Sequence, residues 1–381
     1  MQRRYGKGGL QAAIFVWAMV GLGALSPQDA AGQGCILTRN MSPVLGAQLS
    51  PYLQGGEWQF GAGFRQFTAD TQYQRTEFSQ PVTQNKTQVI SKMKYLELSG
   101  TYAVNPQVNL SVGVPLILLA SSNRALPATV PGSPRFTHSS TGFGDLMIGG
   151  RYWFLNCEEN PDRNISVGLS LKVPTGDSNA TDLFPNAAGL DVRERPVDQS
   201  IQLGDGGWGF ALNFEAFKQF GNMTTFANGI YLFNPKVRND TLSPPALLNP
   251  VGPEAVDARF RFNTVSDSYL LRVGAGYPFP RLPGTALSLA ARIEGVPVTD
   301  IFGDTEGFRR PGYYLTIEPG INFSAGRATY ALSAPLRVHQ NVMDDSYGIR
   351  RDSTFADHMI LMNVNFRFGG VYTEPALGIQ P

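Results

Sequence analysis

Charged residues are scarce in this sequence, and the two signs are evenly balanced. Only 16% of the 381 residues are charged, whereas a soluble domain usually carries about 25%. The 31 Lys and Arg residues face 30 Asp and Glu residues, so there is no basic excess that favours nucleic acid. We therefore expect no nucleic-acid partner. A disordered, highly charged chain is also excluded.

Cysteine and histidine are nearly absent. Two cysteines exclude a disulfide-rich scaffold and the common Cys-based zinc sites. With only three histidines, the sequence contains no metal-binding triad, and it shows neither a phosphate loop nor a dinucleotide fingerprint. We expect no metal site, no cofactor and no enzymatic activity.

Long apolar runs are missing beyond the N-terminus, which excludes a protein that crosses a membrane with several helices. The single run covers residues 10–25, follows a basic start and precedes small residues that end at Gly32. This order is typical of an export signal. We predict that residues 1–32 are a cleaved signal peptide, and an uncleaved anchor is the alternative.

Glycine, proline and aromatic residues are plentiful, and apolar residues recur with a period of two. The chain has 42 Gly and 27 Pro, which excludes a coiled coil. Apolar side chains alternate with Gly, Ser or Asn in segments such as Ile165–Val173 and Ile360–Phe368, and alternation of this kind predicts β-strands. About twelve such segments occur, near residues 57–67, 93–104, 107–120, 143–155, 164–175, 208–220, 224–234, 267–277, 285–296, 312–323, 327–338 and 357–368.

The connections between these segments alternate strictly between short and long. Most segments have ten residues or more, and a tilted strand needs about 9–11 to cross a bilayer. We predict an all-β fold, namely a transmembrane antiparallel up-and-down β-barrel of about 12 strands with short periplasmic turns and long extracellular loops. The long loops are expected near 68–92, 121–142, 176–207, 235–266, 297–311 and 339–356. A secreted β-sandwich is the alternative.

This fold divides the chain into four parts. Residues 33–56 form an N-terminal periplasmic or plug-like segment, residues 57–368 form the barrel, and residues 369–381 form a C-terminal tail. Cys35 and Cys157 both lie on the predicted periplasmic side. Because disulfides persist in exported proteins, we predict that they can pair; two unrelated thiols are the alternative.

If the apolar strand faces contact lipid, the opposite faces line the lumen. The predicted lumen charges are nearly balanced in sign, and Arg272, Arg292, Glu294, Glu318 and Arg337 come from four consecutive strands, so they are candidates for a paired ladder. Two interpretations stay open: the charges neutralise one another in a narrow barrel, or they form a selective constriction. The candidates are Arg65, Glu97, Asp145, Arg151, Lys172, Glu215, Arg272, Arg292, Glu294, Glu318, Arg337 and Arg367.

Two motifs in the first half of the chain resemble a known family. GFGDLMIGGRYWF covers Gly142 to Phe154, and LSLKVPTGD covers Leu169 to Asp177. They resemble the Gly-Leu-Gly-Asp-Leu strand start and the Lys-x-Pro-Thr-Gly strand end of outer-membrane barrels named after the meta-pathway of phenol degradation, with Phe143 in place of the usual Leu. The resemblance implies passage or binding of small, often aromatic or otherwise hydrophobic, compounds across the outer membrane of a Gram-negative cell.

These observations predict a channel for passive passage of such compounds. Its expected partners are outer-membrane lipid and lipopolysaccharide, the solute itself and the barrel-assembly machinery. A structural or adhesin-like barrel without transport is the main alternative. A second alternative is a lipid esterase, because THSSTGFG, from Thr137 to Gly144, resembles the His-x-Ser-x-Gly stretch of outer-membrane phospholipase A. The resemblance implies that His138 activates Ser140.

Overall fold

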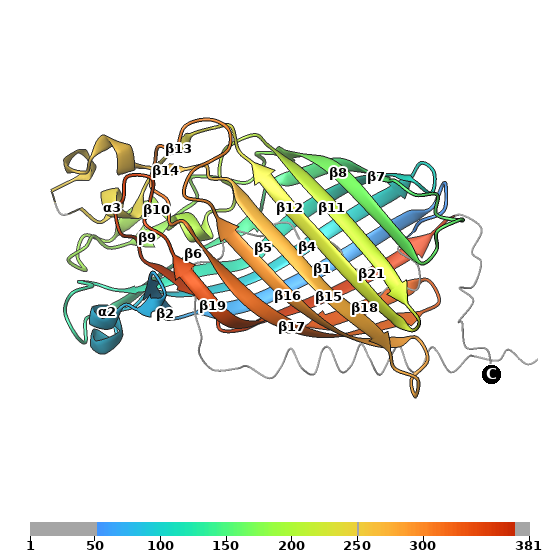
Figure 1. Cartoon of the computed structure of the whole chain (residues 1–381). Coiled ribbons are helices and arrows are strands. Elements are labelled where there is room, and N and C mark those ends of the chain that lie inside the picture. The colour runs from blue at the N-terminus through green and yellow to red at the C-terminus, as the bar shows by residue number, and fades with distance from the viewer. Residues whose placement is uncertain (1–51, 250, 370–381) are drawn as a thin grey trace, which may run out of the picture.

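The computed structural model describes residues 52–249 and 251–369, and these form a closed antiparallel β-barrel (Figure 1). Fourteen strand segments make the main sheet, and two pairs of them are interrupted single strands, so the wall has twelve strands. The barrel closes where β1 pairs with β21, from Trp58 opposite Phe368 to Phe67 opposite Met359. The segments are β1 (Trp58–Ala69), β4 (Ile90–Ala103), β5 (Val108–Ala125), β6 (Arg135–Phe143), β7 (Leu146–Trp153), β8 (Arg163–Val173), β11 (Gly209–Phe220), β12 (Met223–Phe233), β15 (Ser268–Pro278), β16 (Thr285–Val296), β17 (Gly312–Ala325), β18 (Ala328–Ser333), β19 (Leu336–Val342) and β21 (Met359–Phe368). This confirms the predicted fold class.

The two interrupted strands break at residues that weaken a ladder. β6 and β7 both pair with β5 and are separated by Gly144 and Asp145. β18 and β19 both pair with β17 and are separated by Ala334 and Pro335. Proline has no N–H to donate, and glycine lacks a side chain to pack, so both favour interruptions in strands.

The short connections lie at one end of the barrel, which we call the periplasmic end. Two of them are two-residue turns, at 221–222 and 326–327. Gly221 and Gly326 have φ angles of 56° and 57°, and tight hairpin turns demand this left-handed conformation, which glycine adopts without steric cost.

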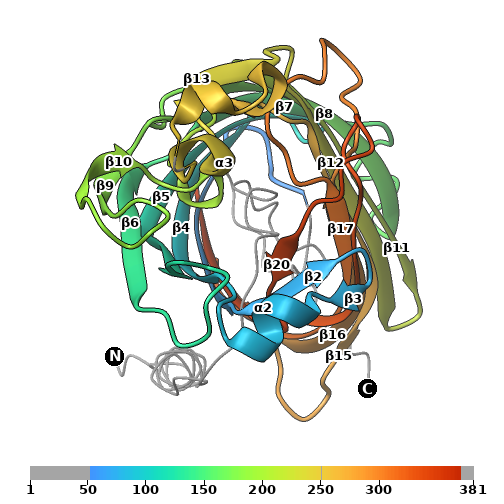
Figure 2. The ribbon, with the colours of Figure 1, turned by 90° about the vertical axis from the view of Figure 1, so that its left-hand side faces the viewer.

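The long connections lie at the other end, the extracellular end, and several contain small elements that fold over the barrel mouth (Figure 2). No helix within the described ranges is both long and apolar enough to span a bilayer. The small elements are β2 (Thr71–Gln74), β3 (Glu77–Phe78), α2 (Gln80–Asn85), β9 (Thr181–Phe184), β10 (Arg193–Pro196), η2 (Gln199–Ile201), β13 (Arg238–Leu242), α3 (Pro244–Leu247), η3 (Pro253–Ala255), η4 (Ala258–Phe260), β14 (Phe262–Thr264) and β20 (Ser353–Phe355).

One predicted loop was too long. Most of residues 121–142 belongs to β5 and β6, so the connection is only 126–134. This extension of the hairpin carries Ser, Asn and Thr on its outer face instead of apolar residues, because it projects beyond the apolar band. The period-two signal of apolar residues therefore disappears there although the strands continue.

The outer surface of the wall is apolar. Leu169, Leu212 and Leu289 are among many large apolar side chains that alternate outward and stay exposed. Aromatic side chains gather toward the periplasmic ends of neighbouring strands, where the Trp58 ring lies 4.8 Å from that of Tyr102 and the Phe60 ring 4.9 Å from that of Phe368. An apolar band bordered by aromatic residues is what a bilayer requires of a barrel.

Candidate functional site

A network of buried charges occupies one side of the barrel interior. The Arg272 Nη2 atom lies 2.9 Å from Glu318 Oε1, and Arg292 joins Glu294 with an Nε–Oε1 distance of 2.6 Å. The Arg292 Nη1 atom also lies 3.7 Å from Glu318 Oε2. Arg65, on β1, completes the network with an Nη2–Oε2 distance of 3.5 Å to Glu294. All five side chains are at most 7% exposed.

The network differs from the predicted ladder in one member. Arg337 does not join it; its guanidinium instead pairs with Asp357, donates to the Ala356 carbonyl at 3.2 Å and stacks over the Tyr73 ring. Arg65 takes the remaining place and also donates to the Tyr314 hydroxyl at 3.2 Å. Since Arg65 is far from Glu294 in sequence, only barrel closure brings them together.

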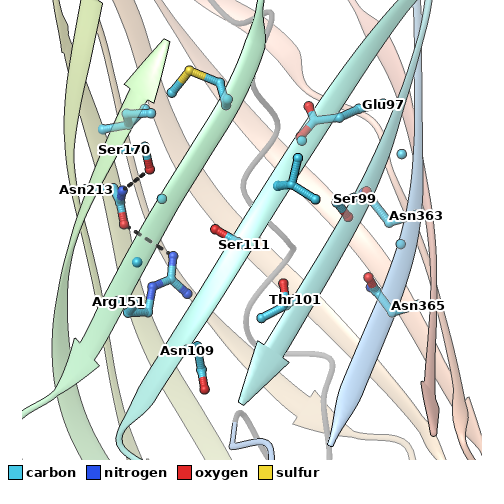
Figure 3. A pocket seen from close by; sticks show the side chains of 18 of the residues that line it. Glu97, Ser99, Thr101, Asn109, Ser111, Arg151, Ser170, Asn213, Asn363 and Asn365 are labelled. Atoms are coloured by element: carbon cyan, nitrogen blue, oxygen red, sulfur yellow. Dashed lines mark hydrogen bonds between the residues drawn. The ribbon is translucent and has the colours of Figure 1, made fainter. Parts of the chain in front are cut away.

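A second pair lies on the opposite side of the interior. Arg151 on β7 forms an ion pair with the buried Glu215 on β11, with an Nη1–Oε2 distance of 2.5 Å. The Arg151 Nη2 atom also donates to Asn213 Oδ1 at 3.4 Å (Figure 3). Arg151 and Glu97 both border the cavity described next.

The cavity lies in the lumen beside this pair and has a volume of about 140 Å³. Small and polar side chains from β1, β4, β5, β7, β8, β11 and β21 form most of its lining (Figure 3). Asn109 Oδ1 and Asn363 Nδ2 are buried and lack hydrogen-bond partners among the described residues. The lining includes Gly61, Gly63, Ser99, Thr101, Asn109, Ser111, Gly113, Gly149, Ser170, Asn213, Asn363 and Asn365.

The other predicted lumen charges lie toward the two ends. Near the extracellular end, Lys172 pairs with Asp205, and Asp145 Oδ1 accepts the backbone N–H of Gly176 at 3.0 Å. At the periplasmic end, Arg367 donates to Gln59 at 3.2 Å and to the Tyr52 carbonyl at 3.0 Å. These three residues fasten segments of the chain instead of joining the central network.

An apolar cluster lies in the extracellular half of the lumen. Inward-pointing strand residues pack against residues from the long connections. The residues from the long connections form the part of the cluster nearest the barrel mouth. These side chains are buried and mostly apolar, so the extracellular half contrasts with the polar cavity. The cluster comprises Phe67, Tyr73, Met93, Tyr95, Ile117, Ala120, Ala180, Val197, Ile201, Leu203, Val296, Tyr314, Val342, Phe355, Ala356 and Met359.

A smaller aromatic cluster lies at the periplasmic end. The Tyr52 ring lies 5.4 Å from Trp153 and 5.7 Å from Phe217 in edge-on contacts. Phe226 belongs to the same cluster, and this explains why β12 has apolar residues on both faces: Phe226 points inward, whereas Tyr231 and Phe233 lie on the outer face. Tyr52 is thus a structural contact of the segment that precedes the barrel.

Cys157 lies in this same cluster, in the turn between β7 and β8. Burial raises the pKa of its thiol to about 11. Cys35 and most of the apolar segment before the barrel lie outside the described residues, so the disulfide and the plug-like role of residues 33–56 stay predictions.

The proposed catalytic pair of an esterase does not have the required hydrogen bonds. The Ser140 hydroxyl donates to the Ile201 carbonyl, and His138 Nε2 accepts the backbone N–H of Asp198 at 3.3 Å. A histidine that activates a serine must instead accept the serine proton. Both side chains fasten the connection between β8 and β11 to β6.

Asp198 is the charged centre of that attachment. Its carboxylate pairs with Arg124 of β5, lies 3.7 Å from Arg310 Nη1 and accepts the backbone N–H of Ser200 at 3.0 Å. Burial by itself raises the pKa of Asp198, but the two guanidinium groups outweigh it and hold the pKa well below its usual range. The ionised carboxylate therefore ties three segments together at the barrel mouth.

The closed wall, the apolar outer band and the enclosed lumen define a transmembrane β-barrel of the outer-membrane type. The chain belongs to the family described as "Putative MetA-pathway of phenol degradation", whose model matches residues 50–249, more than half of the chain. This confirms the resemblance carried by the two motifs. No curated protein sequence matches the chain.

The chain is similar to several solved structures at low sequence identity. An outer-membrane channel from Pseudomonas putida F1 is 13% identical, with a TM-score of 0.53 over 86% of this chain and 100% of that chain. The toluene transporter TbuX of Ralstonia pickettii is 11% identical, with a TM-score of 0.40 over 83% of this chain and 90% of that chain. The P. putida toluene transporter TodX is 10% identical, with a TM-score of 0.39 over 86% of this chain and 93% of that chain.

Proposed function

We propose that this protein is an outer-membrane channel through which small hydrophobic or aromatic compounds pass passively. The observation that carries the proposal is the apolar cluster inside the lumen, which includes Phe67, Tyr95 and Phe355. A water-filled pore for polar solutes has a polar interior. An apolar interior near the extracellular end instead offers an apolar solute a favourable environment, because the solute leaves water on binding there.

The lower lumen suits the next stage of passage. Below the cluster, the cavity of about 140 Å³ is lined by Gly, Ser, Thr and Asn, which leave space and keep water near a solute on its way to the periplasm. The membership in a family described by phenol degradation agrees with a solute that is aromatic and carries a polar group.

The buried network of Arg65, Arg272, Arg292, Glu294 and Glu318 is the proposed constriction. Its three arginines and two glutamates are joined by ion pairs, so its role in this proposal is to hold long side chains across the lumen. The remaining predicted lumen charges keep the barrel and its connections in place. We also propose that the protein is not an enzyme, because the hydrogen bonds of His138 and Ser140 are directed to the backbone.

Uptake into vesicles whose outer leaflet is lipopolysaccharide tests this function. We expect the purified protein to accelerate the uptake of radiolabelled phenol and not of sucrose. Ser111→Trp places a large ring in the cavity and lowers phenol uptake by roughly tenfold, which corresponds to about 1.4 kcal/mol. The matched control is Leu110→Trp, because Leu110 directly precedes Ser111 in β5 and points outward.

Folding is verified in each sample by heat-modifiable gel mobility. If phenol enters equally fast with and without folded protein, the channel proposal is wrong, and a structural or adhesin-like barrel becomes the better description. Equal loss of uptake in Ser111→Trp and Leu110→Trp contradicts the assignment of the cavity to the solute path.

A further inference from the structure

A group of basic side chains lies on the outer surface of the wall, near the extracellular ends of β4 and β6. Lys92 and Lys94 alternate with the inward residues of β4 and are exposed. Arg135, the first residue of β6, is also exposed. Its guanidinium donates to the Lys86 carbonyl at 3.0 Å, which places Lys86 beside it. We call Lys86, Lys92, Lys94 and Arg135 the basic patch.

The charges of the basic patch are not balanced by acids. Within residues 52–249 and 251–369, no carboxylate forms an ion pair with any of these four side chains. Asp182, on neighbouring β9, accepts the backbone N–H of Ser139 at 2.7 Å and its hydroxyl at 3.3 Å. The patch therefore leaves uncompensated positive charge at the protein surface.

Strand register surrounds the basic patch with further hydrogen-bonding groups. Thr68 on β1 and Ser121 on β5 lie opposite Lys92, one on each side. Asn123 and Thr137 lie opposite each other on the same outward face. These residues extend the patch with hydroxyl and amide groups, which can donate further, weaker hydrogen bonds to phosphate oxygens.

The basic patch borders the apolar band that contacts lipid. Leu98, Leu118 and Phe143 lie nearer the middle of the same wall and are 43%, 49% and 63% exposed. Ammonium and guanidinium groups at this position are level with the headgroups of the outer leaflet, while the apolar residues are level with the acyl chains.

The other flank of the barrel has a different chemistry at this end. On β11, β12 and β15 the outward residues are aromatic and contact one another, with ring centroids 4.7 Å apart for Phe210 and Phe233, and 6.4 Å apart for Tyr231 and Tyr269. Phe302 packs on Phe233 at 5.5 Å. Aromatic side chains are the usual border of a membrane-spanning wall, so the basic patch is a local departure from that border.

We propose that the basic patch is a binding site for lipopolysaccharide, whose phosphate groups contact Lys86, Lys92, Lys94 and Arg135 while its acyl chains cover Leu98 and Leu118. Charge complementarity carries this assignment, because phosphorylated lipid is the anionic partner available at the level of the outer leaflet. The Arg135 guanidinium is held in place by hydrogen bonds to Asn123 and to the Lys86 and Gln88 carbonyls, so it contributes a fixed positive charge, and the lysines act as mobile point charges.

Native mass spectrometry of the full-length barrel in detergent tests the site, with purified lipopolysaccharide as the probe. Basic residues at a membrane surface act roughly additively, so Lys92→Gln/Lys94→Gln weakens binding by roughly tenfold or more. Lys218→Gln is the matched control, because Lys218 is exposed on the outer face of β11 at the periplasmic end, and it leaves binding unchanged. Lys92→Arg/Lys94→Arg retains the charge and retains binding.

Two further arms identify the ligand chemistry. Lipopolysaccharide stripped of its lipid phosphates binds no better to the wild type than to Lys92→Gln/Lys94→Gln, and inorganic phosphate at constant ionic strength does not displace the intact lipid. Unchanged binding in the glutamine double variant overturns the proposal. The proposal is also overturned if the wild type binds the stripped lipid as tightly as it binds the intact lipid. Displacement of the intact lipid by inorganic phosphate overturns it in favour of the free ion. Heat-modifiable mobility shows that each variant is folded.

Discussion

The two sides of the lumen fill the same barrel in opposite ways. On the charged side, strands β15 to β17 present Arg272, Arg292, Glu294 and Glu318, which are nearly inaccessible to solvent and joined into one network with Arg65. On the cavity side, strands β1 to β8 present mostly Gly, Ser, Thr and Asn and leave about 140 Å³ open.

This difference shows that side-chain size and pairing decide where the lumen is open. Long charged side chains reach toward the middle of the barrel and hold one another, since a buried charge without a partner is costly. Short side chains do not extend to the middle of the barrel, so their side of the lumen stays open. The charged side should therefore resist substitution, and the cavity side should tolerate it.

The largest effect is expected on the charged side. Glu294→Gln leaves Arg65 and Arg292 without their shared carboxylate, and we expect a loss of about 3 kcal/mol in the free energy of unfolding. Denaturant unfolding of the barrel in detergent measures it. Glu306→Gln is the control, because its ion pair with Arg238 is 42% exposed on both sides, and its loss costs about 0–1 kcal/mol. Equal effects of the two variants contradict the structural role of the network.

A smaller effect is expected at the barrel mouth. Asp198→Asn removes the carboxylate between Arg124 and Arg310, and we expect a loss of roughly 2 kcal/mol at neutral pH, less than for Glu294 because both arginines are partly accessible to water. Faster tryptic cleavage after Arg193, in the same connection, is the structural readout.

The pH dependence of this variant follows from the lowered pKa of Asp198. Its contribution to stability is complete above the ordinary carboxyl pKa of 3.8 and is lost as the pH falls toward the lower pKa of the folded state. The difference in melting temperature between the wild type and Asp198→Asn should therefore be constant from pH 5 to pH 8 and shrink below a pH of about 4. A difference that grows on acidification contradicts the assignment.

The smallest effect is expected on the cavity side. Ser111 is exposed to the lumen, and Ser111→Ala removes only a hydroxyl group there. We expect the free energy of unfolding to stay within about 0.5 kcal/mol of the wild type, and phenol uptake to stay unchanged. A loss well above that size shows that the cavity side is also held together by its polar groups, and the contrast between the two sides then fails.

Much of the wall was predictable because alternation is a local property. In Ile165–Val173 every second residue is apolar, and β8 places those residues outward as expected. The extension of β5 and β6 was missed because its outer face is polar. The apolar residues of β12 do not all lie on one face, because Phe226 belongs to an inner aromatic cluster. In both places the surroundings of a residue, which the sequence does not display, determined its type.

The candidate site was predictable in its composition but not in its contacts. The alternation of apolar residues placed Arg272, Arg292, Glu294 and Glu318 on inward faces of neighbouring strands. Arg337 was expected to join them, but Arg65 takes that place. The small or polar lining residues, such as Ser99 and Asn363, carried only the weak signal of small inward side chains. A cavity is a space between strands that are distant in the chain, so no local pattern marks it.

By itself, then, the sequence determined the number of strands, the face of each that meets lipid and the scarcity of charge, since all three follow from a period of two along a single strand. The tertiary structure decided which charged side chains contact each other, where the lumen stays open and where the basic side chains of the basic patch lie together on the outer surface. Those outcomes depend on closing β1 onto β21 and on extending the β5–β6 hairpin, and both are contacts between segments whose register no short stretch of sequence specifies.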